Sequence, residues 1–224
     1  MIGDALLLSF KLATVTSLIL LIIGLPLARW IAFSRNRFKF LVESVIALPI
    51  ILPPTVLGFY LLVAMGPRSP LGALWISWTG HPLAFSFMGL VVGSVLYSLP
   101  FAVQPFASSF ASVDPALLQA SDTLGASSFR AFREIVVPLS MPGIITGVAL
   151  SFAHTLGEFG VVLMIGGNIP GVTQTISIAI FDQVEALEYS AANHAALLLL
   201  AISFVLLALV YGLNRKVLRV WPFE

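Results

Sequence analysis

Long apolar runs separated by short polar stretches dominate this chain of 224 residues. A helix that crosses the hydrocarbon of a membrane needs about 20 consecutive residues that are mostly apolar. Windows of that length predict five spans, at residues 6–28, 42–65, 85–110, 139–165 and 195–213. We therefore predict an all-α integral membrane protein, in which residues 1–224 form one transmembrane domain with about five transmembrane helices.

The composition supports this prediction and narrows the chemistry. Hydrophobic residues make up 59% of the chain, charged residues 9%, and the mean hydropathy is +1.05, whereas soluble domains are about 25% charged. The net charge of +1 gives no reason to expect a nucleic-acid partner. Because the chain has no cysteine, disulfides and Cys-ligated metal are excluded. Membrane lipid is the expected surrounding, and the composition fits the inner membrane of a bacterium.

The distribution of Lys and Arg predicts the orientation of the spans, because short cytoplasmic loops are enriched in both residues. Asp4 precedes the first apolar run and a basic cluster follows it, the reverse of a secretory signal, so this run is expected to remain a span. We predict the N-terminus outside and the C-terminus inside. Nine of the 11 basic residues then face the cytoplasm, namely Arg29, Arg35, Arg37, Lys39, Arg130, Arg133, Arg215, Lys216 and Arg219.

A polar stretch at residues 114–138, here called the elbow, interrupts the apolar pattern between the third and fourth predicted spans. Asp114 precedes a proline and is typical of a helix start, since its carboxylate can accept free backbone N–H groups. Gly125 predicts the end of that helix, because a residue without Cβ allows the left-handed turn found there. Ser127 or Ser128 then caps a second short helix before the next span.

Prolines inside the predicted spans indicate helices that are broken at membrane depth, because proline removes a backbone hydrogen bond. Two interpretations stay open. The freed backbone groups line a water-filled path, as in transporters, or the prolines only kink helices for packing. The prolines occur in the second, third and fourth spans, as Pro49, Pro53, Pro54, Pro100, Pro105, Pro138 and Pro142.

His154 and Glu158 are ionisable residues within the fourth predicted span, where such residues are costly and usually functional. They are four residues apart, so a continuous helix would place them on one face, able to hydrogen-bond to each other. Either they belong to an outer gate or a dimer contact, or they form a packing pair, with Arg68 as a further partner. The sequence leaves both interpretations open.

The chain lacks the residues that nucleotide binding or catalysis would need. It contains no G-x-x-x-x-G-K-[ST] phosphate loop and no catalytic or metal-ligand spacing. A secondary transporter would be as apolar and as rich in proline, but it would need no cytoplasmic elbow. We therefore expect neither an enzyme nor a chain that binds a cofactor of its own.

The elbow is similar to the cytoplasmic loop of binding-protein-dependent ABC importer permeases, whose pattern is E-A-A, three residues, Gly, nine residues, I-x-L-P. Here Q-A-S at 119–121 precedes Gly125, and after nine residues I-V-V-P follows at 135–138. Gln in place of Glu keeps hydrogen-bonding groups but loses the charge. The resemblance implies a type I importer permease fold and an elbow that docks on an ATP-binding subunit through Gln119, Ala120, Ser121, Gly125, Phe129, Phe132, Ile135 and Pro138. Packing of the two Phe residues against the permease's own helices is the alternative.

Within this family the chain resembles the oxyanion permeases, and most of all those for molybdate. The segments that carry this resemblance are residues 48–66, 110–114, L-G-E-F-G at 156–160 and G-N-I-P-G at 167–171. The resemblance implies a homodimer, two cytoplasmic subunits that bind ATP and Mg, and a periplasmic molybdate-binding protein. Sulfate, thiosulfate or tungstate remains an alternative cargo, and a secondary transporter is a more distant alternative.

A dianion would find no Lys or Arg deep in the predicted spans, and Glu158 would repel it. Hydroxyl groups and glycine backbone could instead let the anion pass without binding it tightly. Selectivity would then reside mainly in the binding protein. The residues expected at the path or its gate are Pro53, Pro54, Thr55, Ser151, His154, Thr155 and Glu158.

Overall fold

The computed structural model describes residues 2–220, with side chains described as far as residue 212. The predicted all-α class is confirmed, since residues 2–220 contain helices and no strand. The predicted cytoplasmic side chains Arg215, Lys216 and Arg219 lie outside the described side chains. In chain order the helices are α1 (Ile2–Phe33), α2 (Lys39–Ile51), α3 (Pro54–Met65), α4 (Pro70–Thr79), α5 (Phe87–Ala111), α6 (Pro115–Thr123), α7 (Ser128–Ala131), the π-helical turn η1 (Phe132–Val136), α8 (Val137–Leu139), α9 (Met141–Gly157), α10 (Gly160–Gly166), α11 (Ile176–Glu185) and α12 (Tyr189–Val220).

Three of the described helices, α1, α5 and α12, are long and apolar enough to cross a membrane, and up to five spans result if bent helix pairs are counted. The second predicted span is such a pair, because α2 and α3 meet at 112°. The fourth predicted span corresponds to α9 and α10, which are separated at Glu158 and Phe159. Breaks expected from proline occur at Pro53 and at Ser140, between Pro138 and Pro142, where residues 128–139 meet α9 at 73°. Pro49 lies inside α2, and Pro100 and Pro105 are accommodated inside a continuous α5.

The centre of the bundle is formed by α1, α5 and α9, which pack around the buried ring of Phe106. A Cβ atom on Gly24 of α1 would lie 3.2 Å from this ring, and one on Gly147 of α9 would lie 2.5 Å from it. The two glycines thus let neighbouring helices enclose the ring from two directions. Small residues at such contacts are typical of membrane helix bundles, where close packing drives association.

The second predicted span, which breaks at Pro53, and the fourth, which breaks at Glu158 and Phe159, pack against each other beyond those breaks. A Cβ on Gly160 of α10 would lie 2.6 Å from Pro54 Cβ, and a Cβ on Gly58 of α3 would lie 2.7 Å from Met164 Cβ. The short helices α3 and α10 therefore approach almost backbone to backbone. As a result, the two breaks lie next to each other in the fold.

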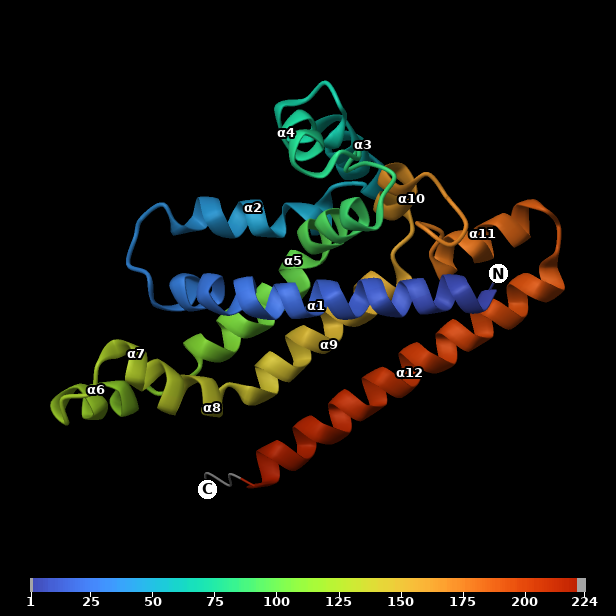
Figure 1. Ribbon diagram of the computed structural model, residues 1–224. Helices are drawn as coiled ribbons and strands as arrows, with labels where there is room; N and C mark the ends of the chain where they lie inside the picture. Colours follow the sequence, from blue (N-terminus) through green and yellow to red (C-terminus); the bar gives the residue numbers. More distant parts are fainter. Residues whose placement is uncertain (1, 221–224) are drawn as a thin grey trace.

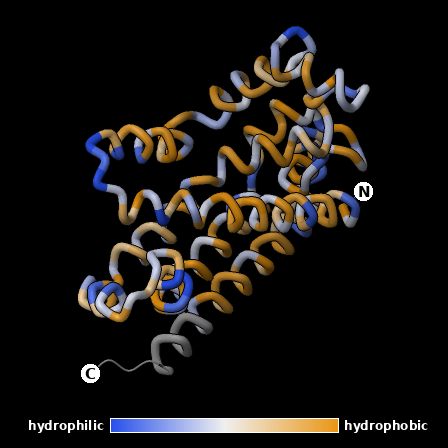
Figure 2. Tube along the Cα trace, turned by 60° about the vertical axis from the view of Figure 1, so that its left-hand side comes forward, coloured by the Kyte–Doolittle hydropathy of each residue, from blue (hydrophilic) through white to orange (hydrophobic). Residues whose placement is uncertain are grey.

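The bundle has two distinct ends. Figure 1 shows α6, α7 and the connection from α1 to α2 at one end, and the N-terminus with α10 and α11 towards the other. Helix α12 runs along the outside of the bundle from the second end towards the first. In Figure 2, hydrophilic residues gather in the connections at the ends, and hydrophobic residues follow the helices between them. Two predicted cytoplasmic clusters, after the first span and in the elbow, thus lie at the same end.

The packing around Phe106 leads to a test of the bundle centre. Replacement of Gly147 by Val should destabilise the protein by about 1–3 kcal/mol, because the added methyl groups collide with the Phe106 ring. Thermal unfolding of the purified protein in detergent measures this effect. Gly212→Val is the matched control, since no atom of another helix among the described residues lies within 4 Å of a Cβ at Gly212. Equal unfolding temperatures for the two variants would contradict the role given to Gly147.

Candidate functional site

The elbow has the caps that its sequence predicts. Asp114 Oδ1 accepts a hydrogen bond from the Ala116 N–H at 2.8 Å, at the start of α6. Gly125 has a φ of +77° and lies just beyond the end of that helix, as expected. Of the two serines proposed as the second cap, Ser127 fills the role, because its Oγ accepts from the Arg130 N–H at 3.3 Å. The caps predicted at both helix starts are therefore confirmed.

The second half of the elbow contains a π-helical turn that was not predicted from the sequence. Within η1 and its flank, the Val137 N–H bonds to the Phe132 carbonyl, five residues back. Pro138 provides the reason, since it has no N–H and its ring would collide with the Glu134 carbonyl in a regular helix. A wider turn removes that collision. Pro138 was the available signal, and such turns often occur at functional sites.

The base of the elbow is closed by two serines that the sequence reasoning missed. Ser109, near the end of α5, donates through Oγ to the Ser140 carbonyl at 3.2 Å, and Ser140 Oγ donates to the Ser109 carbonyl at 3.1 Å. Ser140 is fully buried. The chain therefore leaves and re-enters the bundle at one fixed point, and the elbow projects from that point.

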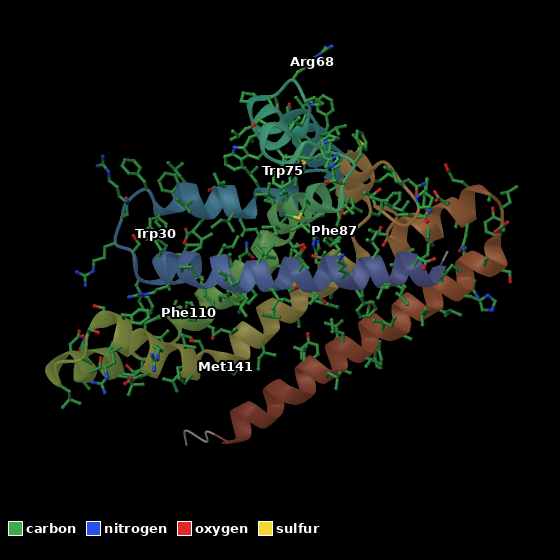
Figure 3. The ribbon with its side chains drawn as sticks, in the orientation of Figure 1. Trp30, Arg68, Trp75, Phe87, Phe110 and Met141 are labelled. Carbon is green, nitrogen blue, oxygen red and sulfur yellow. The ribbon has the colours of Figure 1, made fainter. Side chains whose placement is uncertain are left out.

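One face of the elbow packs on the bundle. Phe132 contacts Phe110 of α5 edge to face, with ring centroids 5.2 Å apart. Phe110, labelled in Figure 3, is fully buried. Ile135 packs against the same hydrophobic cluster, and Ser121 is buried. For Phe132, packing against the helices of its own chain is thus the alternative that the structure supports.

Large apolar side chains of the elbow are also exposed. Leu124, beside Gly125, is 88% exposed, and Phe129 is 63% exposed. Gln119, Ala120 and Pro138 are also exposed. Leu124 was not among the predicted site residues, although an apolar residue next to a helix-ending glycine was a usable signal. This arrangement presents a hydrophobic tip of the kind that suits docking on another protein.

His154 and Glu158 do not bond to each other, and the prediction that they could pair on one helix face was wrong. Helix α9 ends at Gly157, and Glu158 has an extended backbone, so the spacing of four residues no longer aligns the side chains. The pairing suggested with Arg68 is also absent, because Arg68 points away from the bundle (Figure 3). Each side chain instead has partners of its own.

Glu158 lies at the break between α9 and α10 and is buried. Its Oε1 accepts a hydrogen bond from the Val161 N–H of α10 at 2.8 Å. The carboxylate therefore pairs with a backbone N–H group that the break leaves free. Such a group is costly to leave unpaired inside a membrane.

His154 bonds through Nδ1 to Ser98 Oγ at 2.9 Å, and its ring stacks on Phe101 with centroids 3.9 Å apart.

The remaining residues predicted for the path lie in two different environments. Ser151 is fully buried, and its hydroxyl donates to the Val148 carbonyl of its own helix. Thr155 is buried and shares a hydrogen bond with Ser98. In contrast, Pro53 and Thr55 are exposed on the surface of this chain, and Pro54 is half-buried. The fold of one chain therefore does not bring the predicted path residues to one surface.

Two further polar features were missed by the sequence reasoning. One is a cavity of about 470 Å³ between α2 and α5. Glu43, Ser44 and Gln104 are among the residues that line it, and these polar residues inside predicted spans could have indicated the cavity.

The other lies at the opposite end of the bundle, where Asp182 of α11 accepts hydrogen bonds from Asn168 Nδ2 and Gln174 Nε2, at 2.9–3.0 Å. Asp182 thereby holds the loop that contains G-N-I-P-G.

Comparison with known proteins identifies the family. The family described as "binding-protein-dependent transport system inner membrane component" matches residues 21–219. This chain belongs to that family. The permease is 50% identical over 208 residues to the molybdenum transport system permease protein ModB of Azotobacter vinelandii, covering 93% of this chain and 92% of that protein.

More distant relatives show the range of the family. The permease is 34% identical over 197 residues to the sulfate transport system permease protein CysT of Escherichia coli (strain K12), covering 87% of this chain and 70% of that one. A chain of the MetNI methionine ABC transporter, in inward-facing conformations, has the same fold, with a TM-score of 0.77 and 13% identity over 97% of this chain and 96% of that chain. The protein is thus a multi-pass inner-membrane permease with the fold of type I ABC importers.

In this permease, Gly125 allows a test of the elbow turn. Space around its Cβ is open, so the positive φ alone should decide what the position accepts. Gly125→Asn should keep the turn, whereas Gly125→Val should strain it by about 1–2 kcal/mol or more. We expect an ATP-binding subunit to co-purify with the Asn variant and to be lost from the Val variant. Equal recovery with both variants would contradict this account of the turn.

A second test concerns Glu158. Glu158→Gln keeps an oxygen that can accept from the Val161 N–H, whereas Glu158→Ala leaves that group unpaired, at a cost of about 1–3 kcal/mol. The Gln variant should keep the unfolding temperature and the transport activity of the unaltered protein, whereas both should fall in the Ala variant. Thermal unfolding and uptake in vesicles measure the difference. If the Gln variant failed as badly as the Ala variant, charge rather than capping would be the function of Glu158.

Proposed function

We propose that this chain is the membrane-spanning subunit of an ATP-driven importer that carries molybdate across the bacterial inner membrane. The observation that carries the proposal is its 50% identity to a molybdenum transport permease along nearly the whole of both chains. Identity to the sulfate permease is lower, at 34%. Sulfate, thiosulfate or tungstate is therefore the second candidate cargo.

The working assembly consists of two copies of this chain, two cytoplasmic ATP-binding subunits and a periplasmic molybdate-binding protein. The permease itself is not catalytic. ATP and Mg bind to the partner subunits, in keeping with the absence of a phosphate loop from this sequence. The exposed apolar tip formed by Leu124 and Phe129 supports docking of the elbow on such a subunit.

Orientation follows from the same assembly. The elbow and the basic loop after α1 lie at one end of the bundle, which is the cytoplasmic end if the elbow meets an ATP-binding subunit. The N-terminus then lies outside, with the loop held by Asp182 near the binding protein. ATP binding shifts the balance between inward-open and outward-open states, and the elbow transmits that bias.

Uptake of labelled molybdate by vesicles that contain all three components tests the cargo. Molybdate should accumulate only with ATP and the binding protein, and excess sulfate should compete weakly. The permease dimer alone should not bind molybdate tightly, since its spans offer no deep Lys or Arg. Preferential uptake of sulfate, or uptake without ATP, would contradict the proposal.

A further inference from the structure

Arg29 connects the first helix of the bundle to the elbow. It lies on α1 near the elbow end, and its guanidinium carbon is 4.7 Å from the centroid of the Phe132 ring. Its Nη2 also donates a long hydrogen bond, 3.5 Å, to the Ser128 carbonyl of α7. A guanidinium over an aromatic ring is attracted to the ring electrons, more strongly where water is partly excluded. Arg29 is half-buried.

The contact continues into the core of the bundle. Phe132 lies against Phe110 of α5, which belongs to the same buried cluster as Ala28, the residue that precedes Arg29. Helices α5 and α9 are joined to the elbow by the chain itself, but α1 is not adjacent to it in sequence. Arg29 and Phe132 therefore give α1 a direct contact with the elbow.

A cavity beside this contact leaves room for movement. Its volume is about 190 Å³, and Arg29, Phe33, Asp122 and Phe132 are among the residues that line it, between the end of α1 and the elbow. A tightly packed contact would transmit force but could not be rearranged. A planar guanidinium can slide along the face of a ring and keep its attraction for as long as it stays over that face.

We propose that Arg29 is a positioning residue that transmits movement of the elbow to α1 through Phe132, and so couples ATP hydrolysis to transport. The inference rests on the proposed importer function and adds a named residue to it. Arg29 entered the sequence analysis only as one of the basic residues that predict orientation.

Arg37 supplies a matched control. Its guanidinium carbon is also 4.7 Å from a phenylalanine ring, but the ring belongs to the neighbouring Phe38. Arg29→Gln and Arg37→Gln therefore remove the same charge and the same kind of contact from the same end of the molecule. Only the first removes a contact with the elbow.

The measurement is the ratio of anion imported to ATP hydrolysed, in vesicles with the complete transporter. For Arg29→Gln we expect assembly and ATP hydrolysis within about twofold of the unaltered complex, and a ratio about tenfold lower, within the usual range of coupling between sites. Arg37→Gln should change the ratio by less than about twofold. Equal ratios for the two variants would overturn the proposal. Parallel loss of hydrolysis and import would overturn it as well, since that result indicates lost docking.

Two further variants keep the test decisive. Arg29→Lys retains the charge but not the planar stack, so the Lys variant should assemble even if the Gln variant does not. Its ratio of anion imported to ATP hydrolysed should lie between those of the unaltered complex and the Gln variant. An unchanged ratio in the Lys variant would overturn the proposal. Combining Arg29→Gln with Phe132→Leu should lower the ratio no further than the worse single change, whereas additive losses would show that the two residues act separately. Ratios are taken against the unaltered chain with whichever oxyanion it imports, so a wrong cargo assignment would be recognised separately.

Discussion

The close packing of α1, α5 and α9 around Phe106 is the contact on which the rest of the molecule depends. Lipid offers helices little hydrophobic reason to associate, so their contacts must come from close van der Waals packing. Gly24 and Gly147 provide it by letting the ring be enclosed from both sides. Because α5 leads into the elbow and α9 leads out of it, this packing also brings Ser109 and Ser140 together. The elbow thus stands on a base that the bundle centre defines.

A second constraint operates where the spans are broken. Inside a membrane, a backbone N–H without a partner is costly, so a broken helix must find a substitute. Glu158 supplies one to α10, and the glycines at 58 and 160 let α3 and α10 pack closely beyond their breaks. A buried carboxylate that looks like a site for an ion is therefore, in this chain, part of the support of a broken helix. The breaks at Pro53 and Glu158 lie next to each other, beside α3 and α10, in a region away from the elbow.

The elbow itself has two faces with different tasks. Phe132 packs on the bundle through Phe110, whereas the side chains of Leu124 and Phe129 are exposed. A permease that carries no phosphate loop must receive the energy of ATP through contact with another protein. The exposed side chains are those proposed for that contact, and Phe132 carries the contact with Arg29 of α1. The elbow meets α9 at 73° at Ser140, the residue that the serine pair fixes at the base of the elbow.

The sequence by itself determined the features that depend on neighbouring residues. Apolar run length predicted the membrane class, and local hydrogen bonding and backbone freedom placed the caps at Asp114 and Gly125. Spacing around Gly125 was enough to indicate the family. Only the tertiary structure decided that His154 bonds to Ser98, that Glu158 caps α10, and that Arg29 stacks on Phe132. Those contacts join residues on different helices or depend on where a helix breaks. Which side chains meet there is set by how the helices pack, and the spacing of residues along one segment does not contain that information.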